Sequence, residues 1–154
     1  MSGEYDKIDD IRTALLTLLQ ADATLSAKIN KFLTEDGGTI GINQYPACET
    51  IHMATAKASS KKPNYRDTAA SKHRCYTFII RFYTNISDPE ESKKQLQELS
   101  ECVDDIVSKN YRLNGTCLAE WTDTKYGVRL NAKGDPFQRI ADAFVDCFAM
   151  IPRN

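Results

Sequence analysis

Four side chains of the kind that bind zinc stand in two strand-like runs of the sequence, Cys48 with His52 and His73 with Cys75. They could surround one ion if the two strands paired in a suitable register. A cysteine and a histidine four residues apart on a strand, however, are separated by about 13 Å, which is too far for one tetrahedral ion. The spacing matches no zinc motif either, so we expect no metal site and interpret the cysteines as small buried hydrophobic residues.

Two carboxylates near the end of the sequence, Asp142 and Asp146, could form an acid pair on a helix, where residues four apart come within about 6 Å. On a strand they would be about twice as far apart, and we interpret them as part of a solvated or interface surface. The dinucleotide, P-loop, nucleophile-elbow and zincin motifs are all missing from the sequence. We therefore expect no catalytic residue, no cofactor and no enzymatic activity.

The segment of residues 56–74 (AKASSKKPNYRDTAASKHR) is strongly basic. It holds six of the twenty lysine and arginine residues against one aspartate, a local charge of +5, and it has no Ile, Leu, Val, Phe or Met. Because the net charge of the chain is −1, the rest of it carries −6. A connection this long and polar cannot build a core, and such connections are usually functional or disordered. We predict a mobile partner-binding loop with the candidate residues Lys57, Lys61, Lys62, Tyr65, Arg66, Lys72 and Arg74.

Three interpretations of this loop remain open from the sequence. Its basic residues, with Tyr65 among them, could contact nucleic-acid phosphates. The loop could equally become ordered against an acidic protein surface. The third interpretation is a solvated loop without a partner.

Length and composition are typical of one globular domain spanning residues 1–154, with 42% hydrophobic and 27% charged residues. The five cysteines are scattered and odd in number, which favours free thiols in a reducing cytosol over a disulfide framework. No stretch approaches the length of about 18 apolar residues that a membrane span needs, and the first ten residues do not resemble a signal peptide. We expect a soluble protein without a membrane partner.

Two helices are predicted before the first strand. Ile8, Ile11, Leu15 and Leu18 recur at helical spacing, which predicts an amphipathic helix over residues 5–20. A second, short helix is predicted with Asp22 as its cap and Gly37-Gly38 as its end. Its apolar residues would be Leu25, Ile29 and Phe32.

A strand hairpin is predicted next. Residues 46–53 alternate, with Cys48 and His52 on one face, and residues 75–84 are rich in aromatic and β-branched side chains. The basic segment would form the long tip between them. A helix then begins at Ser87-Asp88-Pro89 with cap residues and continues to Asn110, where a left-handed residue would end it.

The last third of the sequence is predicted as further strands. Residues 117–121 and 128–130 flank a polar kink, and residues 133–136 form a turn. The spacing of apolar residues in 137–151 fits a helix slightly better than a strand. The order of elements predicts an α+β fold, with a mainly antiparallel sheet of about four strands and with the N-terminal helices and one central helix packed on one face.

This order resembles the tail terminator, or tail completion, proteins of long-tailed bacteriophages. The resemblance covers about residues 5–151 and rests on four phrases: Tyr45-Pro46 before the first strand, the strand of residues 74–83, the bridge Asn-Tyr-Arg-Leu-Asn-Gly at 110–115, and the segment 137–148. In that family the last element is a strand and the loop after the first strand orders on meeting a partner. The resemblance therefore implies a strand at 137–148.

The resemblance also implies a function. Such proteins form a hexameric ring that caps the tail tube, ends tail elongation and offers the joining surface for the head. The implied partners are further copies of the chain, the tail tube protein and the head–tail connector protein, with a passing contact to DNA in the lumen. The implied location is the neck of a virion assembled in the host cytoplasm. Two alternatives are another neck or head-closure component and a small nucleic-acid-binding module that uses the basic loop.

Overall fold

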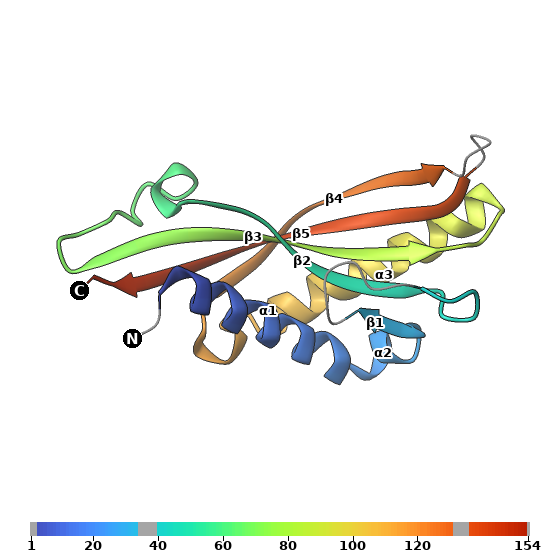
Figure 1. The fold of residues 1–154 in the computed structure, drawn as a ribbon, viewed down its shortest axis with the longest axis horizontal. Helices are drawn as coiled ribbons and strands as arrows, with labels where there is room; N and C mark the ends of the chain where they lie inside the picture. The colour runs from blue at the N-terminus through green and yellow to red at the C-terminus, as the bar shows by residue number, and fades with distance from the viewer. Residues whose placement is uncertain (1–2, 34–39, 131–135, 154) are drawn as a thin grey trace.

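The computed structural model describes residues 3–33, 40–130 and 136–153. The expected helix end at Gly37-Gly38 lies outside these ranges, and so do residues 133–135 of the turn expected at 133–136, whose Pro136 is the first residue of β5. No helix in the described ranges is both long enough and apolar enough to cross a membrane. The elements, shown in Figure 1, are α1 (Glu4–Ala21), α2 (Ala23–Ser26), β1 (Lys31–Leu33), β2 (Ala47–Lys57), η1 (Ala58–Ser60), β3 (Ser71–Thr84), α3 (Pro89–Lys109), η2 (Leu113–Gly115), β4 (Leu118–Leu130) and β5 (Pro136–Pro152).

The strands form one mixed sheet in the order β1-β2-β3-β5-β4. The α+β class is confirmed, but the sheet has five strands instead of four, and β1 pairs with β2 in parallel. The fifth strand was missed because Phe32 continues the helical spacing of Leu25 and Ile29. The structure ends α2 after one turn, and the Asn30 N–H then donates to the Pro46 carbonyl, which leads the chain into pairing with β2.

The C-terminal segment is a strand, as the family resemblance implied and as apolar spacing alone did not. β5 lies between β3 and β4, so both of its edges are paired, and residues 145–149 are all buried. Ala141, Ala143 and Val145 face the helices, while Phe144 and Phe148 lie on the opposite face. A strand with apolar residues on both faces does not alternate strictly, which explains its helix-like spacing.

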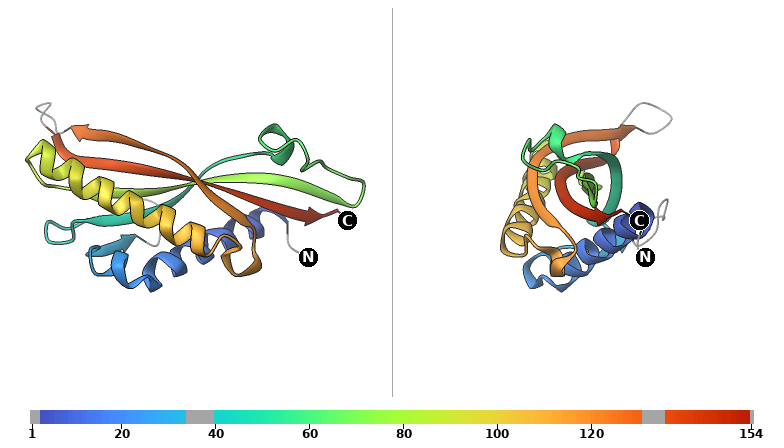
Figure 2. Two further views of the ribbon diagram at one scale, coloured as in Figure 1. Left: turned by 180° about the vertical axis from the view of Figure 1, so that it is seen from behind. Right: turned by 90° about the vertical axis from the view of Figure 1, so that its left-hand side faces the viewer.

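Both long helices cover the same face of the sheet. Leu15 of α1 and Leu99 of α3 belong to one buried cluster with Phe78 and Phe82 of β3. Figure 2 shows the two helices on one side of the strongly twisted strands. The opposite face, called the open face below, carries no α-helix in the described ranges.

The start and the end of α3 were predicted correctly, but the conformation of the residue that ends it was not. The Asp88 carboxylate accepts the Glu91 N–H at 3.3 Å, and Pro89 occupies the first turn. Asn110 is not left-handed, with φ −127° and ψ 39°. Its side-chain amide instead donates to the Ile106 carbonyl at 2.9 Å, which satisfies a free end of the helix without a positive φ.

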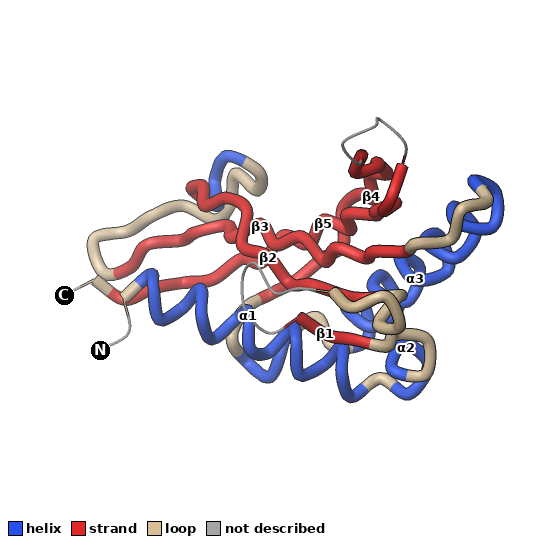
Figure 3. The backbone as a smooth tube through the Cα atoms, turned by 45° about the vertical axis from the view of Figure 1, so that its right-hand side comes forward, coloured by secondary structure: helices blue, strands red, loops and turns tan. Residues whose placement is uncertain are grey.

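The hairpin of β2 and β3 is antiparallel, as expected, but its strands are longer than predicted. Lys57 pairs with Arg74, so Ala56, Lys57 and residues 71–74 belong to strands and the connection spans only 58–70. We call residues 58–70 the hairpin tip. Figures 1 and 3 place the tip at the opposite end of the molecule from the start of α3.

The expected kink in the fourth strand is a bulge. β4 runs as one strand from Leu118 to Leu130, and its register with β5 shifts between Trp121 and Asp123. The polar residues around Thr122 therefore interrupt the pairing without ending the strand.

Candidate interaction surfaces

The hairpin tip is tied to the open face by a buried carboxylate. Lys61 Nζ lies 3.0 Å from both carboxylate oxygens of Asp146, and the Thr77 hydroxyl donates to the same carboxylate at 2.8 Å. Asp146 is only 5% exposed. Burial opposes the charged form of Lys61, but the hydrogen bond and the charge of Asp146 outweigh burial and raise the pKa of Lys61.

The tip also covers a small apolar cluster. Ala58, Cys75 and Phe148 are buried together, and the Tyr65 ring meets the Phe148 ring edge-on with centroids 5.6 Å apart. The Lys62 ammonium lies 5.3 Å from the centre of the Phe148 ring. The expectation that residues 56–74 build no core is therefore wrong in part, because Ala58 and Tyr65 of the tip pack against Phe148 of β5.

The seven predicted partner-binding residues lie at one end of the molecule but divide into two groups. Lys61, Lys62, Tyr65 and Arg74 contact the chain itself: Lys62 pairs with Glu120 at 3.4 Å and Arg74 with Asp67 at 3.0 Å. Within the described ranges, no ion pair forms at the other three, Lys57, Arg66 and Lys72. The expected mobility of the tip remains a prediction.

Asp67 connects the hairpin tip to the start of β3 and to Arg153, which follows β5. Its carboxylate accepts the His73 backbone N–H at 2.9 Å and two bonds from Arg74. Arg153 lies 3.5 Å away on the other side. The hydrogen bond from His73, followed by that from Arg74, lowers the pKa of Asp67 below its ordinary value.

We expect Lys61→Met to loosen the tip. The change leaves the buried Asp146 carboxylate with the Thr77 hydroxyl as its remaining side-chain donor. Breaking a fully buried ion pair lowers the free energy of unfolding by about 3–5 kcal/mol. Lys61 is partly exposed and solvent screens the pair, so we expect a loss of about 1–2 kcal/mol. Hydrogen exchange of the tip amides should accelerate. The double variant K61M/D146L should regain most of the stability, and a double variant less stable than K61M would contradict this view of the pair.

The residues considered for chemistry are kept apart. Cys48 belongs to the core under the helices and Cys75 to the cluster under the tip, so they lie on opposite faces of the sheet. In the part of the chain that the structure describes, no three His, Cys, Asp or Glu residues are arranged to hold a metal ion. On the strand, Asp142 and Asp146 have separate partners, and Asp142 forms a two-point pair with Arg81 at 2.6 and 2.9 Å.

The Arg81 and Asp142 pair was not found from the sequence because its members are far apart in the chain. They face each other only through the register of β3 and β5. Hydrogen bonding to Asp142 outweighs burial and raises the pKa of Arg81. Together with Lys61 and Asp146, this pair places two ion pairs on the open face.

The Tyr83 hydroxyl donates to the buried Glu49 carboxylate at 2.6 Å, and burial together with Glu49 raises the pKa of Tyr83 to about 12. The ordinary pKa of a tyrosine is 10.0, so between pH 10 and about pH 12 the Tyr83 hydroxyl loses its proton in the unfolded chain and keeps it in the folded chain. Stability should therefore fall by about 2–3 kcal/mol as pH rises through this range. Tyr83→Phe should lose this dependence and be about 1–3 kcal/mol less stable at neutral pH, since Glu49 loses its donor. Urea unfolding of both proteins across the range provides the measurement, and parallel curves would contradict the assignment.

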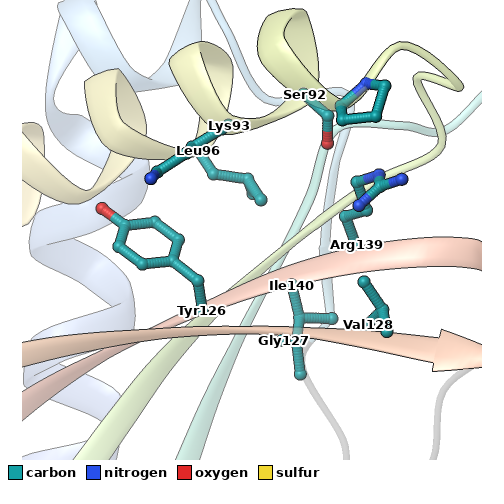
Figure 4. Close-up of a pocket in the computed structure, with 9 residues that line it drawn as sticks. Ser92, Lys93, Leu96, Tyr126, Gly127, Val128, Arg139 and Ile140 are labelled. Atoms are coloured by element: carbon teal, nitrogen blue, oxygen red, sulfur yellow. The ribbon is translucent and has the colours of Figure 1, made fainter.

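Two hollows follow one another along the gap between α3 and β4, and we call them together the α3–β4 groove. The first has a volume of about 280 Å³ and is mostly apolar, with a cationic rim. Figure 4 shows its side chains converging from α3, β4 and β5. Its lining consists of Pro89, Ser92, Lys93, Leu96, Tyr126, Gly127, Val128, Arg139 and Ile140.

The second hollow, of about 270 Å³, is polar and acidic. Tyr126 borders both hollows, so the groove changes from apolar to acidic along its length. One signal for this hollow is present in the sequence, namely polar residues of α3 at i, i+3, i+4 and i+7. Its lining consists of Gln97, Ser100, Glu101, Asp104, Trp121, Thr124 and Tyr126.

The sheet has two edges in the described ranges. β4 pairs only with β5 and exposes Leu118, Tyr126 and Val128 by 42%, 45% and 46%. At the opposite edge of the sheet, β1 pairs with β2 from Ala47 to Glu49, and the rest of β2 has no strand on its outer side among the described residues. Exposed edges with apolar residues are typical places for a further strand or chain to bind.

Comparison with known proteins identifies the fold. No protein-family model matches the sequence, and no curated protein is significantly similar to it. Twenty-seven chains of solved structures match the fold. One of them belongs to the virion of a native gene transfer agent particle, with a TM-score of 0.58 and 14% sequence identity, and the match covers 96% of this chain and all of the other. The chain is therefore similar in fold, over almost its whole length, to a chain of the gene transfer agent virion.

Proposed function

We propose that this protein is a structural component of a phage-like virion. The observation that carries the proposal is the similarity in fold to a chain of the gene transfer agent virion, since it covers 96% of one chain and all of the other. A role in binding and assembly, without a covalent step, agrees with a surface made of sheet edges, a charged tip and a groove.

Within the virion, we infer the role of tail terminator: a ring, hexameric in the family that the sequence resembles, that caps the tail tube, stops its growth and joins it to the head. A ring needs a heterologous interface, in which one surface of a subunit meets a different surface of the next. The two sheet edges, β4 and the outer part of β2, provide two such different surfaces. The partners would be further copies of the chain, the tail tube protein and the head–tail connector.

Tube length provides the test. In a phage that lacks this chain, tail tubes should grow beyond their normal length and remain without heads, and adding the purified chain should restore normal length. Electron microscopy should show the added chain as a ring at one end of the tube. Tubes of normal length, or a ring on the head side of the joint, would contradict the terminator role; the latter would assign the chain to the neck or the head closure.

A nucleic-acid-binding role is the second candidate, because Lys57, Arg66 and Lys72 form no ion pair in the described ranges. The Tyr65 ring, however, packs on Phe148 and is less available to stack on a base. This contact favours a protein partner for the tip. Binding to DNA that weakens steeply with added salt would support the second candidate instead.

A further inference from the structure

One buried hydroxyl in the lining of the α3–β4 groove has no partner in the part of the chain that the structure describes. Ser92 is fully buried, and its hydroxyl has no hydrogen-bond partner among the described residues. Figure 4 shows this hydroxyl turned toward the apolar hollow. A buried hydroxyl without a partner is costly, so an occupant that offers it a backbone N–H or carbonyl would be favoured.

The other half of the groove carries uncompensated negative charge. Glu101 and Asp104 lie one turn apart on α3, and in the described ranges neither forms an ion pair. Asp104 accepts only the Ser108 hydroxyl, at 3.2 Å. Trp121 and Tyr126 form the facing wall from β4. The occupant of this half should therefore be basic.

The chain itself contains a segment with this chemistry. At the hairpin tip, Arg66 and the adjoining Lys57 are exposed, and Arg66 bonds only to the Pro63 carbonyl of its own turn. Pro63 and Asn64, between the two cations, are exposed and could enter the apolar half. Tip and groove lie apart along one molecule, with the tip beyond one end of the sheet and α3 against the other (Figures 1 and 3). A contact between them must therefore join two copies.

We propose that the α3–β4 groove receives the hairpin tip of a second copy of this chain, with Arg66 and Lys57 placed against Glu101 and Asp104. The interface is heterologous, because tip and groove are different surfaces, and each copy can give its tip to one neighbour and its groove to another. The inference rests on the proposed function in that it supplies a contact between neighbouring copies of the ring. DNA does not fit this groove, since its phosphates would meet two carboxylates.

Charge reversal on each side, followed by mixing, tests the pairing. One variant is E101K/D104K in the groove, and the other is K57E/R66E at the tip. Self-association is measured by sedimentation velocity. A carbodiimide that joins lysine to carboxylate is applied to mixtures of isotope-labelled and unlabelled chain, so that mass spectrometry distinguishes cross-links between copies from cross-links within one.

Wild-type chains should give mixed-isotope cross-links from Lys57 to Glu101 or Asp104. Each variant alone should self-associate about ten- to a hundredfold more weakly, because like charges now face each other. An equimolar mixture of the two variants should recover association, since the groove of one then complements the tip of the other. Added salt should weaken the wild-type contact.

Several outcomes would overturn the inference: wild-type chains without these cross-links, a variant that associates as wild type does, or a mixture that recovers nothing. The matched control is E90K/E98K, the same charge change at exposed residues of α3 outside the groove, which should associate normally. Circular dichroism checks that every variant is folded. The capping of tail tubes is measured separately. If the charge variants change self-association as expected but the wild-type chain caps no tubes, the proposed function alone is contradicted. If the chain caps tubes and the charge variants leave self-association unchanged, this inference alone is contradicted.

Discussion

Replacing residues 58–73 by Asn-Gly is expected to leave the monomer folded and to abolish the tube capping that we propose for it. Lys57 and Arg74 are paired partners, and Asn-Gly favours the two-residue turn that joins such a pair. The main core includes no residue of the removed segment. The loss should come from the exposed cluster around Phe148, at about 1.5–3 kcal/mol, and from the Lys61–Asp146 pair, at about 1–2 kcal/mol. The last three residue pairs at the start of β3 are removed as well.

Two measurements check this result. Circular dichroism and urea unfolding should show a cooperative transition with a slightly lower midpoint, and electron microscopy should show tubes without caps. The matched control keeps the whole tip and exchanges Ser59 and Ser60 for Ala. A shortened chain that is unfolded would show that the tip belongs to the core, and one that still caps tubes would show that the tip is not an assembly surface.

Phe78→Ala is expected to destabilise the protein by about 3–5 kcal/mol, the cost of removing a large side chain from a well-packed core. Phe78 is fully buried on β3, in the cluster that both helices share, and its ring lies 5.4 Å from that of His52. Since domains of this size are stable by about 5–15 kcal/mol, this loss removes a large part of the total.

The free energy of unfolding in urea provides the measurement for Phe78→Ala. Tyr111→Ala is a suitable control, because it also removes an aromatic ring, but from a side chain that is 48% exposed. It should change the free energy of unfolding by no more than about 0.5 kcal/mol. Equal effects of the two substitutions would contradict the position of Phe78 at the centre of the core.

Local sequence signals predicted most of the helices and the hairpin. α1 followed from its apolar spacing, and α3 from the cap at Asp88 and Pro89. These signals work because the groups that start a helix are near neighbours in the chain. β5 was different: its apolar spacing favoured a helix, and only the family resemblance indicated a strand. A strand with apolar residues on both faces loses the alternation by which strands are recognised.

The candidate surfaces depend on contacts that no local signal reveals. Lys61 and Asp146 are 85 residues apart in sequence, and their pairing depends on how the tip folds over β5. The same holds for Arg81 and Asp142, which are 61 residues apart. The basic segment was recognised from its composition, but composition could not tell the cations that stay exposed from those that hold the tip in place.

The position of β5 has a consequence for synthesis. β5 is made after β4, yet it is the strand that joins β4 to β3. Until residues 136–152 have left the ribosome, β3 and β4 each present an open edge where β5 will later lie, and such edges attract other chains. Products that stop before residue 136 should therefore aggregate or be degraded. Because β3 and β4 are joined only through β5, an incomplete chain would lack the finished sheet on which the proposed assembly depends.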